Sequence, residues 1–117
     1  AMLARNYARA VRIVGAMLEE GVEPIVVVSR IARVWRQLFI GKGLVGKMAP
    51  KEVAAAASAP SWKAADFVGH CKRYPWAQLS KGFREILQAD RAFKTSSPRP
   101  EPYLDALLWK LMQQESR

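Results

Sequence analysis

Apolar residues recur at three- and four-residue spacing along most of the chain, a period that predicts helices. The clearest stretch runs from Trp76 to Met112 and holds two such patterns, separated by a polar connector at 95–100. The first pattern places these side chains on one helix face: Leu79, Phe83, Ile86, Leu87, Asp90, Phe93 and Lys94. The second predicts a closing helix whose inward face holds Leu104, Leu107, Leu108 and Leu111, with Trp109 well off that face.

Two further long helices are predicted in the first third of the chain. One runs from Leu3 to Glu20 and stops at Gly21, and its expected inward residues are Leu3, Tyr7, Ala10, Val14, Met17 and Leu18. The other begins at Glu23-Pro24, because proline suits the first helical turn. The run 25–28 alone would suggest a strand. The helical period that continues beyond it favours a helix, with these residues inward: Val28, Ile31, Ala32, Trp35, Leu38 and Phe39.

The middle of the chain predicts shorter helices. The glycines Gly41, Gly43 and Gly46 are expected to break the chain after the second helix. A short helix is predicted from Pro50 to Ala57, and another starts at Ala59-Pro60 with Trp62, Ala65, Val68 and Cys71 inward. No alternating segment bounded by hairpin turns is present. The sequence therefore predicts an all-α fold, a compact bundle of five or six helices forming one domain over residues 1–117.

Composition is that of a soluble globular protein, with 50% hydrophobic and 25% charged residues. The long apolar-rich segments contain arginines, so no membrane span is expected. A single cysteine cannot form an internal disulfide, which fits a cytoplasmic location. We expect the chain to be the C-terminal part of a longer protein.

The net charge says more about possible partners than the overall composition does. Lys and Arg number 19 against 10 Asp and Glu, an excess that favours nucleic acid or acidic partners. The excess also has a plain explanation, since basic residues are good solvated helix formers. Six basic residues without an intervening acid make up a predicted basic patch, a candidate DNA contact: Arg30, Arg33, Arg36, Lys42, Lys47 and Lys51.

One motif imitates a phosphate-binding loop. The segment 41–47 satisfies Gly-x-x-x-x-Gly-Lys, but Met48 stands where the motif needs a hydroxyl to hold magnesium. The preceding segment is predicted to be helix rather than strand, and Pro50 interrupts the helix that should follow. A glycine-rich connector is the better interpretation, and no nucleotide site is predicted.

Catalytic and metal sites find no support in the sequence. His70 and Cys71 are adjacent, and neighbouring helical side chains point about 100° apart, so they cannot face each other as a catalytic or metal-binding pair. Cys71 is predicted to be a small core residue. No carboxylate pair lies in an apolar context that would tune it for acid–base work. We therefore expect no enzyme activity and no cofactor.

A DNA-binding helix-turn-helix is the alternative reading of the segment from Pro50 to Arg73. It offers a short helix, a tight turn at 58–60, and a second helix that would enter the major groove. The exposed positions of that second helix carry Lys63, Asp66 and Lys72, which provide little base-reading chemistry.

Three blocks resemble the C-terminal domain of the delta subunits of bacterial DNA polymerase III. The first is an Asp90-x-x-x-Lys94 pair, a short Ser/Pro loop and a Leu-rich last helix. The second is Ala32-Arg33 followed by Arg36 and apolar residues, and the third is the helix from Ala59-Pro60 to Arg73-Tyr74, where alanine replaces the family's histidine. Asp90 and Lys94 are expected to form a partly buried structural pair that also holds the following loop.

The resemblance implies a role in DNA replication. In that family this domain is the collar module, which packs with the delta-prime and ATPase subunits to hold the clamp loader together. The sliding clamp would be reached only through an N-terminal AAA+-like region that the chain lacks, and the parent protein would be a non-ATPase subunit of the DNA polymerase III holoenzyme. Non-specific DNA is a further expected partner of the basic surface. Candidate partner-interface residues are Arg33, Gln37 and Trp109.

Overall fold

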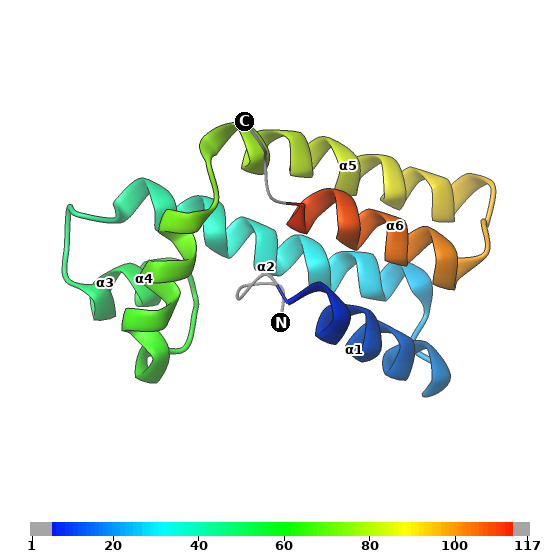
Figure 1. Ribbon diagram of the computed structural model, residues 1–117, viewed down its shortest axis with the longest axis horizontal. Helices are drawn as coiled ribbons and strands as arrows, with labels where there is room; N and C mark the ends of the chain where they lie inside the picture. Colours follow the sequence, from blue (N-terminus) through cyan, green and yellow to red (C-terminus); the bar gives the residue numbers. More distant parts are fainter. Residues whose placement is uncertain (1–5, 114–117) are drawn as a thin grey trace.

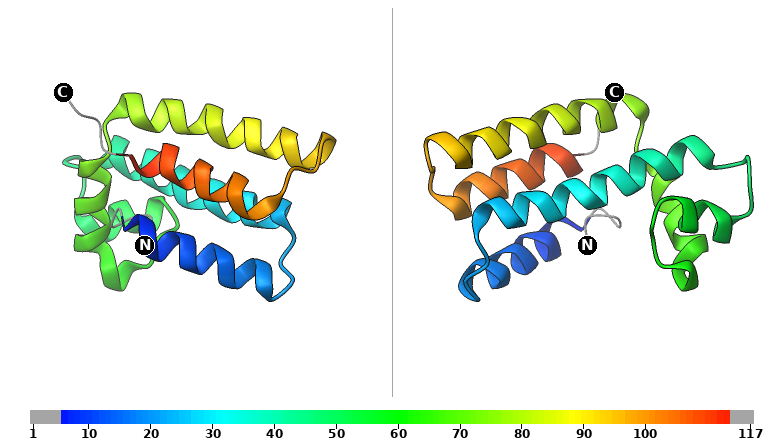
Figure 2. Two further views of the ribbon diagram at one scale, coloured as in Figure 1. Left: turned by 45° about the vertical axis from the view of Figure 1, so that its right-hand side comes forward. Right: turned by 180° about the vertical axis from the view of Figure 1, so that it is seen from behind.

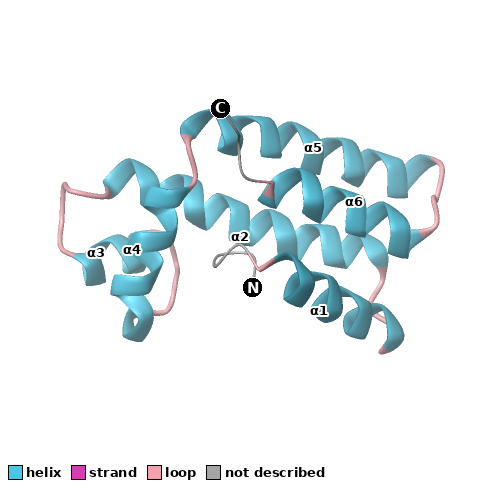
Figure 3. Cartoon of the chain, viewed as in Figure 1, coloured by secondary structure: helices cyan, strands magenta, loops and turns pink. Residues whose placement is uncertain are grey.

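Six α-helices and one short 3₁₀ helix make up the part of the chain that the computed structural model describes, residues 6–113. The α-helices are α1 (Tyr7–Glu19), α2 (Pro24–Leu44), α3 (Pro50–Ala56), α4 (Ala64–Arg73), α5 (Trp76–Thr95) and α6 (Pro100–Met112), and the 3₁₀ helix η1 spans Ser61–Lys63. Short loops join them, and the described residues form no strand (Figure 3). The predicted all-α bundle is confirmed.

Local sequence explains where the helices start and stop. The Asn6 side chain accepts a hydrogen bond from the Arg9 amide at 3.0 Å and so caps α1. Gly21 follows α1 with φ of +92°, a conformation that glycine adopts without strain. Prolines open α2, α3 and α6, where the missing amide proton costs nothing. The predicted start of the first helix at Leu3 lies outside the described residues.

The helices are arranged around the long α2. Helix α5 lies alongside α2, α6 packs on α5, and α1 packs mainly on α6, while α3 and α4 pack on each other at the C-terminal half of α2 (Figures 1 and 2). The first and last helices are therefore neighbours. Figure 1 shows α3 and α4 at one end of the molecule and α1 at the other.

Trp35 is the centre of the core. Its side chain is fully buried, its Nε1 donates to the Leu79 carbonyl oxygen at 2.9 Å, and its ring packs edge-on against Tyr74 with centroids 5.2 Å apart. Gly82 of α5 lies directly on the indole, where a Cβ atom would come within 2.4 Å of the ring. The absence of a side chain at position 82 is what lets α5 approach α2 so closely.

One buried polar side chain ties α5 to α6. Gln78 donates to the carbonyl oxygens of Leu111 at 2.7 Å and Gln113 at 3.0 Å, so it satisfies carbonyls at the end of α6 that have no partner within the helix. The inward position of Gln78 was not predicted, because its neighbours in sequence gave no sign that this polar residue would be buried.

The second helix extends further than predicted. Gly41 and Gly43 lie inside α2, and only Gly46, with φ of +85°, follows it as a turn residue. A Cβ at position 41 would lie 2.6 Å from the Cys71 sulfur and 2.7 Å from the Phe67 ring. Gly41 is therefore present because α4 approaches α2 closely there, and the expected break at this glycine is wrong.

Three inward faces were partly misassigned. Phe39 of α2 is 40% exposed and Ala65 of α4 is also exposed, although the pattern placed both inward. Residues 61–63 form the 3₁₀ helix, so α4 itself begins at Ala64 and buries Ala64, Phe67 and Cys71, whereas Trp62 is 77% exposed. The large Phe67 ring, absent from the predicted face, sets the phase of this helix. In α5, Leu87 is 57% exposed although the pattern placed it inward. By contrast, the predicted leucine face of α6 is buried as expected.

Candidate partner-binding surface

Arginines from the predicted basic patch line a hollow at the C-terminal half of α2. The hollow has a volume of about 400 Å³ and is lined by Arg33, Arg36, Gln37, Ile40, Ala57 and Ser58. Gln37 donates from Nε2 to the Ser58 carbonyl oxygen at 3.0 Å, which fixes the turn after α3 against α2. Within residues 6–113, neither Arg33 nor Arg36 forms an ion pair with a carboxylate. This arginine hollow is thus rich in hydrogen-bond donors and positive charge.

The structure divides the rest of the predicted basic patch. Lys42 is nine residues after Arg33, which places it about half a turn round α2. Its Nζ lies 3.5 Å from the Cys71 carbonyl oxygen and 5.6 Å from the centre of the Trp76 ring, away from the arginine hollow. Lys47 and Lys51 are exposed beyond the end of α2. The predicted patch is therefore a stripe of three arginines on α2 plus separate lysines.

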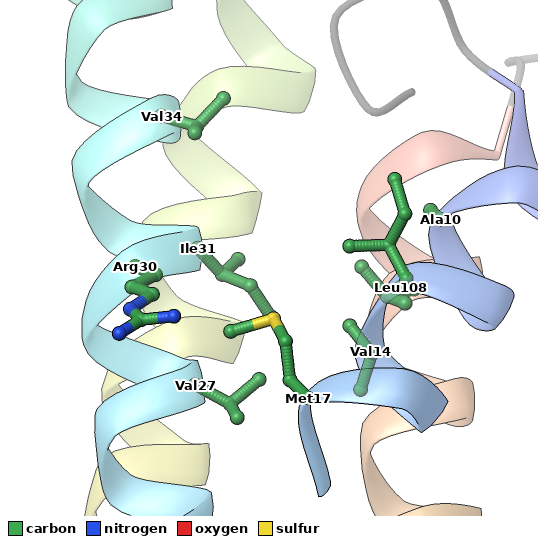
Figure 4. A pocket seen from close by; sticks show the side chains of 9 residues that line it. Ala10, Val14, Met17, Val27, Arg30, Ile31, Val34 and Leu108 are labelled. Atoms are coloured by element: carbon green, nitrogen blue, oxygen red, sulfur yellow. The ribbon is translucent and has the colours of Figure 1, made fainter. Parts of the chain in front are cut away.

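An apolar groove lies between α1 and α2, with α6 at its floor. It has a volume of about 230 Å³. The residues that line it are Ala10, Ile13, Val14 and Met17 of α1, Val27, Arg30, Ile31 and Val34 of α2, and Leu108 of α6. Figure 4 shows the α2 and α1 side chains on opposite walls, with the Met17 side chain reaching across toward α2. Arg30 is the one charged residue in this lining.

Trp109 is only partly covered. Its side chain is 54% exposed, and one edge contact is made with Tyr7 of α1, whose ring centre is 5.4 Å away. The Tyr7 hydroxyl donates to the Asp105 carbonyl oxygen at 3.1 Å, so Tyr7 attaches α1 to α6 at two points. Trp109 lies neither in the groove nor in the arginine hollow. The three predicted interface residues thus fall in two places, Arg33 with Gln37 and Trp109 apart.

The predicted ion pair in α5 forms. Lys94 Nζ lies 2.9 Å from the Asp90 carboxylate, with 62% and 32% of the two side chains exposed. At this exposure the pair contributes only a few tenths of a kcal/mol. The following turn is held by other groups, since the amides of Ser96 and Ser97 donate to the Ala92 carbonyl oxygen at 2.9 and 3.0 Å. The expected ion pair is therefore present, but the turn after α5 is held by backbone hydrogen bonds and not by this pair as expected.

The glycine-rich segment lacks the geometry of a phosphate loop. Residues up to Leu44 belong to α2, so no strand precedes a loop, and the amides of this stretch are used within the helix. Only a turn of a few residues, with an isolated bridge between Val45 and Met48, separates α2 from α3. Nothing in this segment forms the cradle of free amides that a phosphate needs.

His70 and Cys71 point to different surroundings, as predicted. Cys71 is fully buried, and burial raises the pKa of its thiol to about 11. The Nδ1 atom of His70 is buried without a hydrogen-bond partner among the described residues. Burial, followed by the nearby charge of Arg73, lowers the pKa of His70 below its usual 6.5. Across residues 6–113, no group of three potential metal ligands comes together.

Helices α3 and α4 pack together as the alternative reading expected. The turn between them contains Ser58 with φ of +61°, and Lys63, Asp66 and Lys72 are exposed. The Lys63 ammonium lies 4.7 Å from the centre of the exposed Trp62 ring. These side chains still provide no bidentate donor–acceptor pair for a base edge, so the geometry adds nothing in favour of sequence-specific DNA reading.

Comparison with protein families identifies the chain. Residues 1–111 match the model of the DNA polymerase III delta subunit, C-terminal domain. The chain belongs to this family. The delta C-terminal domain is not a catalytic domain. Comparison with curated proteins and with solved structures gave no match.

No helix within the described part of the delta domain is long and apolar enough to cross a membrane. The blocks that carried the resemblance, namely the α2 arginines, the α4 helix and the Asp90–Lys94 pair, all fall inside the matched residues. The groove between α1 and α2 was missed, because a face that is apolar in sequence gives no sign of being left open. Tyr7 was predicted to face inward, but its link to α6 joins residues 98 apart, which sequence spacing cannot reveal.

Proposed function

We propose that this delta domain is the collar module of a clamp loader, which holds the assembly together by packing against the corresponding domains of the delta-prime and ATPase subunits. The observation that carries the proposal is the family match over residues 1–111. The fold supports it, because the bundle leaves two kinds of surface uncovered: an apolar groove with a cationic edge, and a half-exposed tryptophan. Such surfaces are typical of protein interfaces.

The uncovered residues suit protein contact better than catalysis. Tryptophan is enriched among the residues that contribute most to interfaces, and Trp109 retains more than half of its surface for a partner. The clamp-opening arm and the ATPase sites would belong to other regions of the assembly. The role of this domain is therefore to hold the subunits of the assembly together.

Replacement of Trp109 tests the proposal. We expect Trp109→Ala to weaken assembly with the delta-prime and ATPase subunits about tenfold or more, because an exposed interface anchor is lost. The chain should remain folded, since the edge contact with Tyr7 is worth only about 0.5–1.5 kcal/mol. Sedimentation velocity on the reconstituted subunits gives the affinity, and circular dichroism checks the fold.

Trp62→Ala provides a matched control. Trp62 is 77% exposed in η1, and the Lys63 ammonium lies 4.7 Å from the centre of its ring. Its replacement should leave assembly unchanged. If the Trp109→Ala variant assembles normally, or if it unfolds, Trp109 is not an interface residue. Failure of the unchanged chain to join the other subunits would refute the collar proposal itself.

A further inference from the structure

The apolar groove and the arginine hollow follow one another along α2. Arg30, which lines the groove, and Gln37, which lines the hollow, are seven residues apart, about two turns, so they share one helix face. From Val27 to Ile40 the two sites extend along roughly 20 Å of helix. We call the surface made up of these two sites the α2 track.

The two halves of the α2 track would bind different kinds of side chain. The groove is apolar except for Arg30, and Ile13 on its α1 wall is 45% exposed. The hollow offers two guanidinium groups that form no ion pair within residues 6–113. The residues of α1 and α2 that form the track include no acid, since no Asp or Glu occurs in 6–18 or in 24–51. The potential along the track is therefore positive.

We propose that the α2 track is the docking site of an acidic amphipathic helix from a partner subunit. Apolar side chains of that helix fill the groove, and its carboxylates pair with Arg30, Arg33 and Arg36. Arginine guanidinium groups bind carboxylates through paired hydrogen bonds. A groove between two helices commonly binds a third helix. This inference rests on the proposed assembly role and specifies the surface and the partner chemistry.

The apolar half of the α2 track disfavours nucleic acid as the bound partner. A phosphate backbone would satisfy the arginines, but it would leave the groove around Val34 and Ile13 filled by water. An acidic helix satisfies both halves at once. A partner of about four turns spans the whole track, because its length would be roughly 20 Å.

Charge and apolar variants test the two halves separately. Arg33→Glu combined with Arg36→Glu reverses the charge of the hollow, and Ile13→Glu places a carboxylate on the groove wall at an already exposed position. The matched controls are Arg84→Glu and Leu87→Glu on α5, which are also exposed and lie outside the track. The probes are the purified delta-prime and ATPase subunits from the same organism as this chain, and a labelled duplex DNA.

Both track variants should weaken subunit binding about tenfold or more, and both controls should change it less than about twofold. Circular dichroism must show that each variant is folded. If Ile13→Glu binds the subunits normally, the α2 track is not the docking site, even where Trp109→Ala is impaired and the collar role stands. If Ile13→Glu abolishes duplex DNA binding with no effect on the subunits, the occupant is nucleic acid and the proposal is wrong.

A crosslink identifies the occupant. Cys71 is fully buried, so Ile13→Cys would introduce an accessible thiol for attachment of a photoreactive group. The expected crosslink joins position 13 to a helix of a partner subunit that is rich in Asp and Glu on one side. A crosslink to a second copy of this chain, or to the chain's own residues, would overturn the proposal.

Discussion

At the residue scale, His70 shows how local environment sets a chemical property. Its imidazole lies in the last turns of α4, where burial is the largest influence on its pKa, Arg73 adds to the lowering, and Asp66 opposes it. The buried Nδ1 has no hydrogen-bond partner among the described residues that would stabilise the protonated imidazole. The neutral form is therefore the one that the fold accommodates.

A pH dependence of stability follows from His70. Because its folded-state pKa lies below the unfolded value of about 6.5, the unfolded chain binds the proton more tightly. The contribution of neutral His70 is complete above pH 6.5 and is lost as the pH falls below that value through the folded pKa. Urea unfolding at pH 7.5 and 5.5 should show a larger loss for the unchanged chain than for His70→Gln. An NMR titration giving a pKa at or above 6.5 would contradict this.

Cys71 provides a second prediction at this scale. Burial raises its thiol pKa to about 11, and the thiolate is the reactive form, so the native protein should resist thiol reagents at pH 8. In urea the same cysteine should react at the rate of an ordinary exposed thiol. Rapid labelling of the native chain would show that α4 leaves α2 readily.

At the element scale, the contact of α2 with α5 depends on Gly82. We expect Gly82→Ala to destabilise the fold by about 1–3 kcal/mol, because the new methyl group would push against the fully buried Trp35 indole. Alanine's higher helix propensity recovers at most about 1 kcal/mol of that loss. The free energy of unfolding, measured in urea, gives the difference.

Gly15→Ala is the matched control. Position 15 is also inside a helix, but the nearest atom to a new Cβ would be a Glu101 carboxylate oxygen at 3.9 Å. This substitution should stabilise the protein by up to about 1 kcal/mol. Equal effects of the two substitutions would mean that helix propensity, rather than the approach of Trp35, governs position 82.

The sequence predicted elements well and their packing less well. Periodicity located every helix among residues 6–113, and the leucine face of α6 was correct, because apolar spacing records which side is buried. Gly41 was misread as a break, since a glycine that admits a neighbouring helix looks the same in sequence as one that ends a helix. Trp62 and Leu87 were placed inward because hydrophobicity alone cannot identify an apolar side chain that stays exposed.

The candidate site was predicted only in part. Arg33 and Arg36 were predicted as members of an acid-free basic run, and Gln37 as a partner-interface candidate, and the structure brings the three together around the arginine hollow. Lys42 was grouped with them because no acid intervened, although the helical turn carries it to another face. The apolar groove could not be foreseen, since it depends on how α1, α2 and α6 pack together, which the pattern of a single helix does not reveal.

At the scale of the whole molecule, the net charge of +9 governs encounters with polyanions. We expect the chain to bind duplex DNA weakly and without preference for sequence, because the arginine stripe provides charge and α4 provides no base-reading pair. Affinity should fall steeply as salt is raised. Fluorescence anisotropy with two duplexes of unrelated sequence measures both properties, and a strong preference for one duplex at physiological salt would support the helix-turn-helix alternative instead.

The pairing of the first helix with the last has a consequence for how the protein is made. Tyr7 reaches Asp105 and Trp109 across almost the full chain, whereas α3 and α4 meet close in sequence. On the ribosome, α3 and α4 can meet soon after both have emerged, but α1 lacks its main packing partner until α6 has been synthesised. The domain can therefore complete its folding only after α6 has been synthesised. Until then, the apolar face of α1 that packs on α6 remains uncovered.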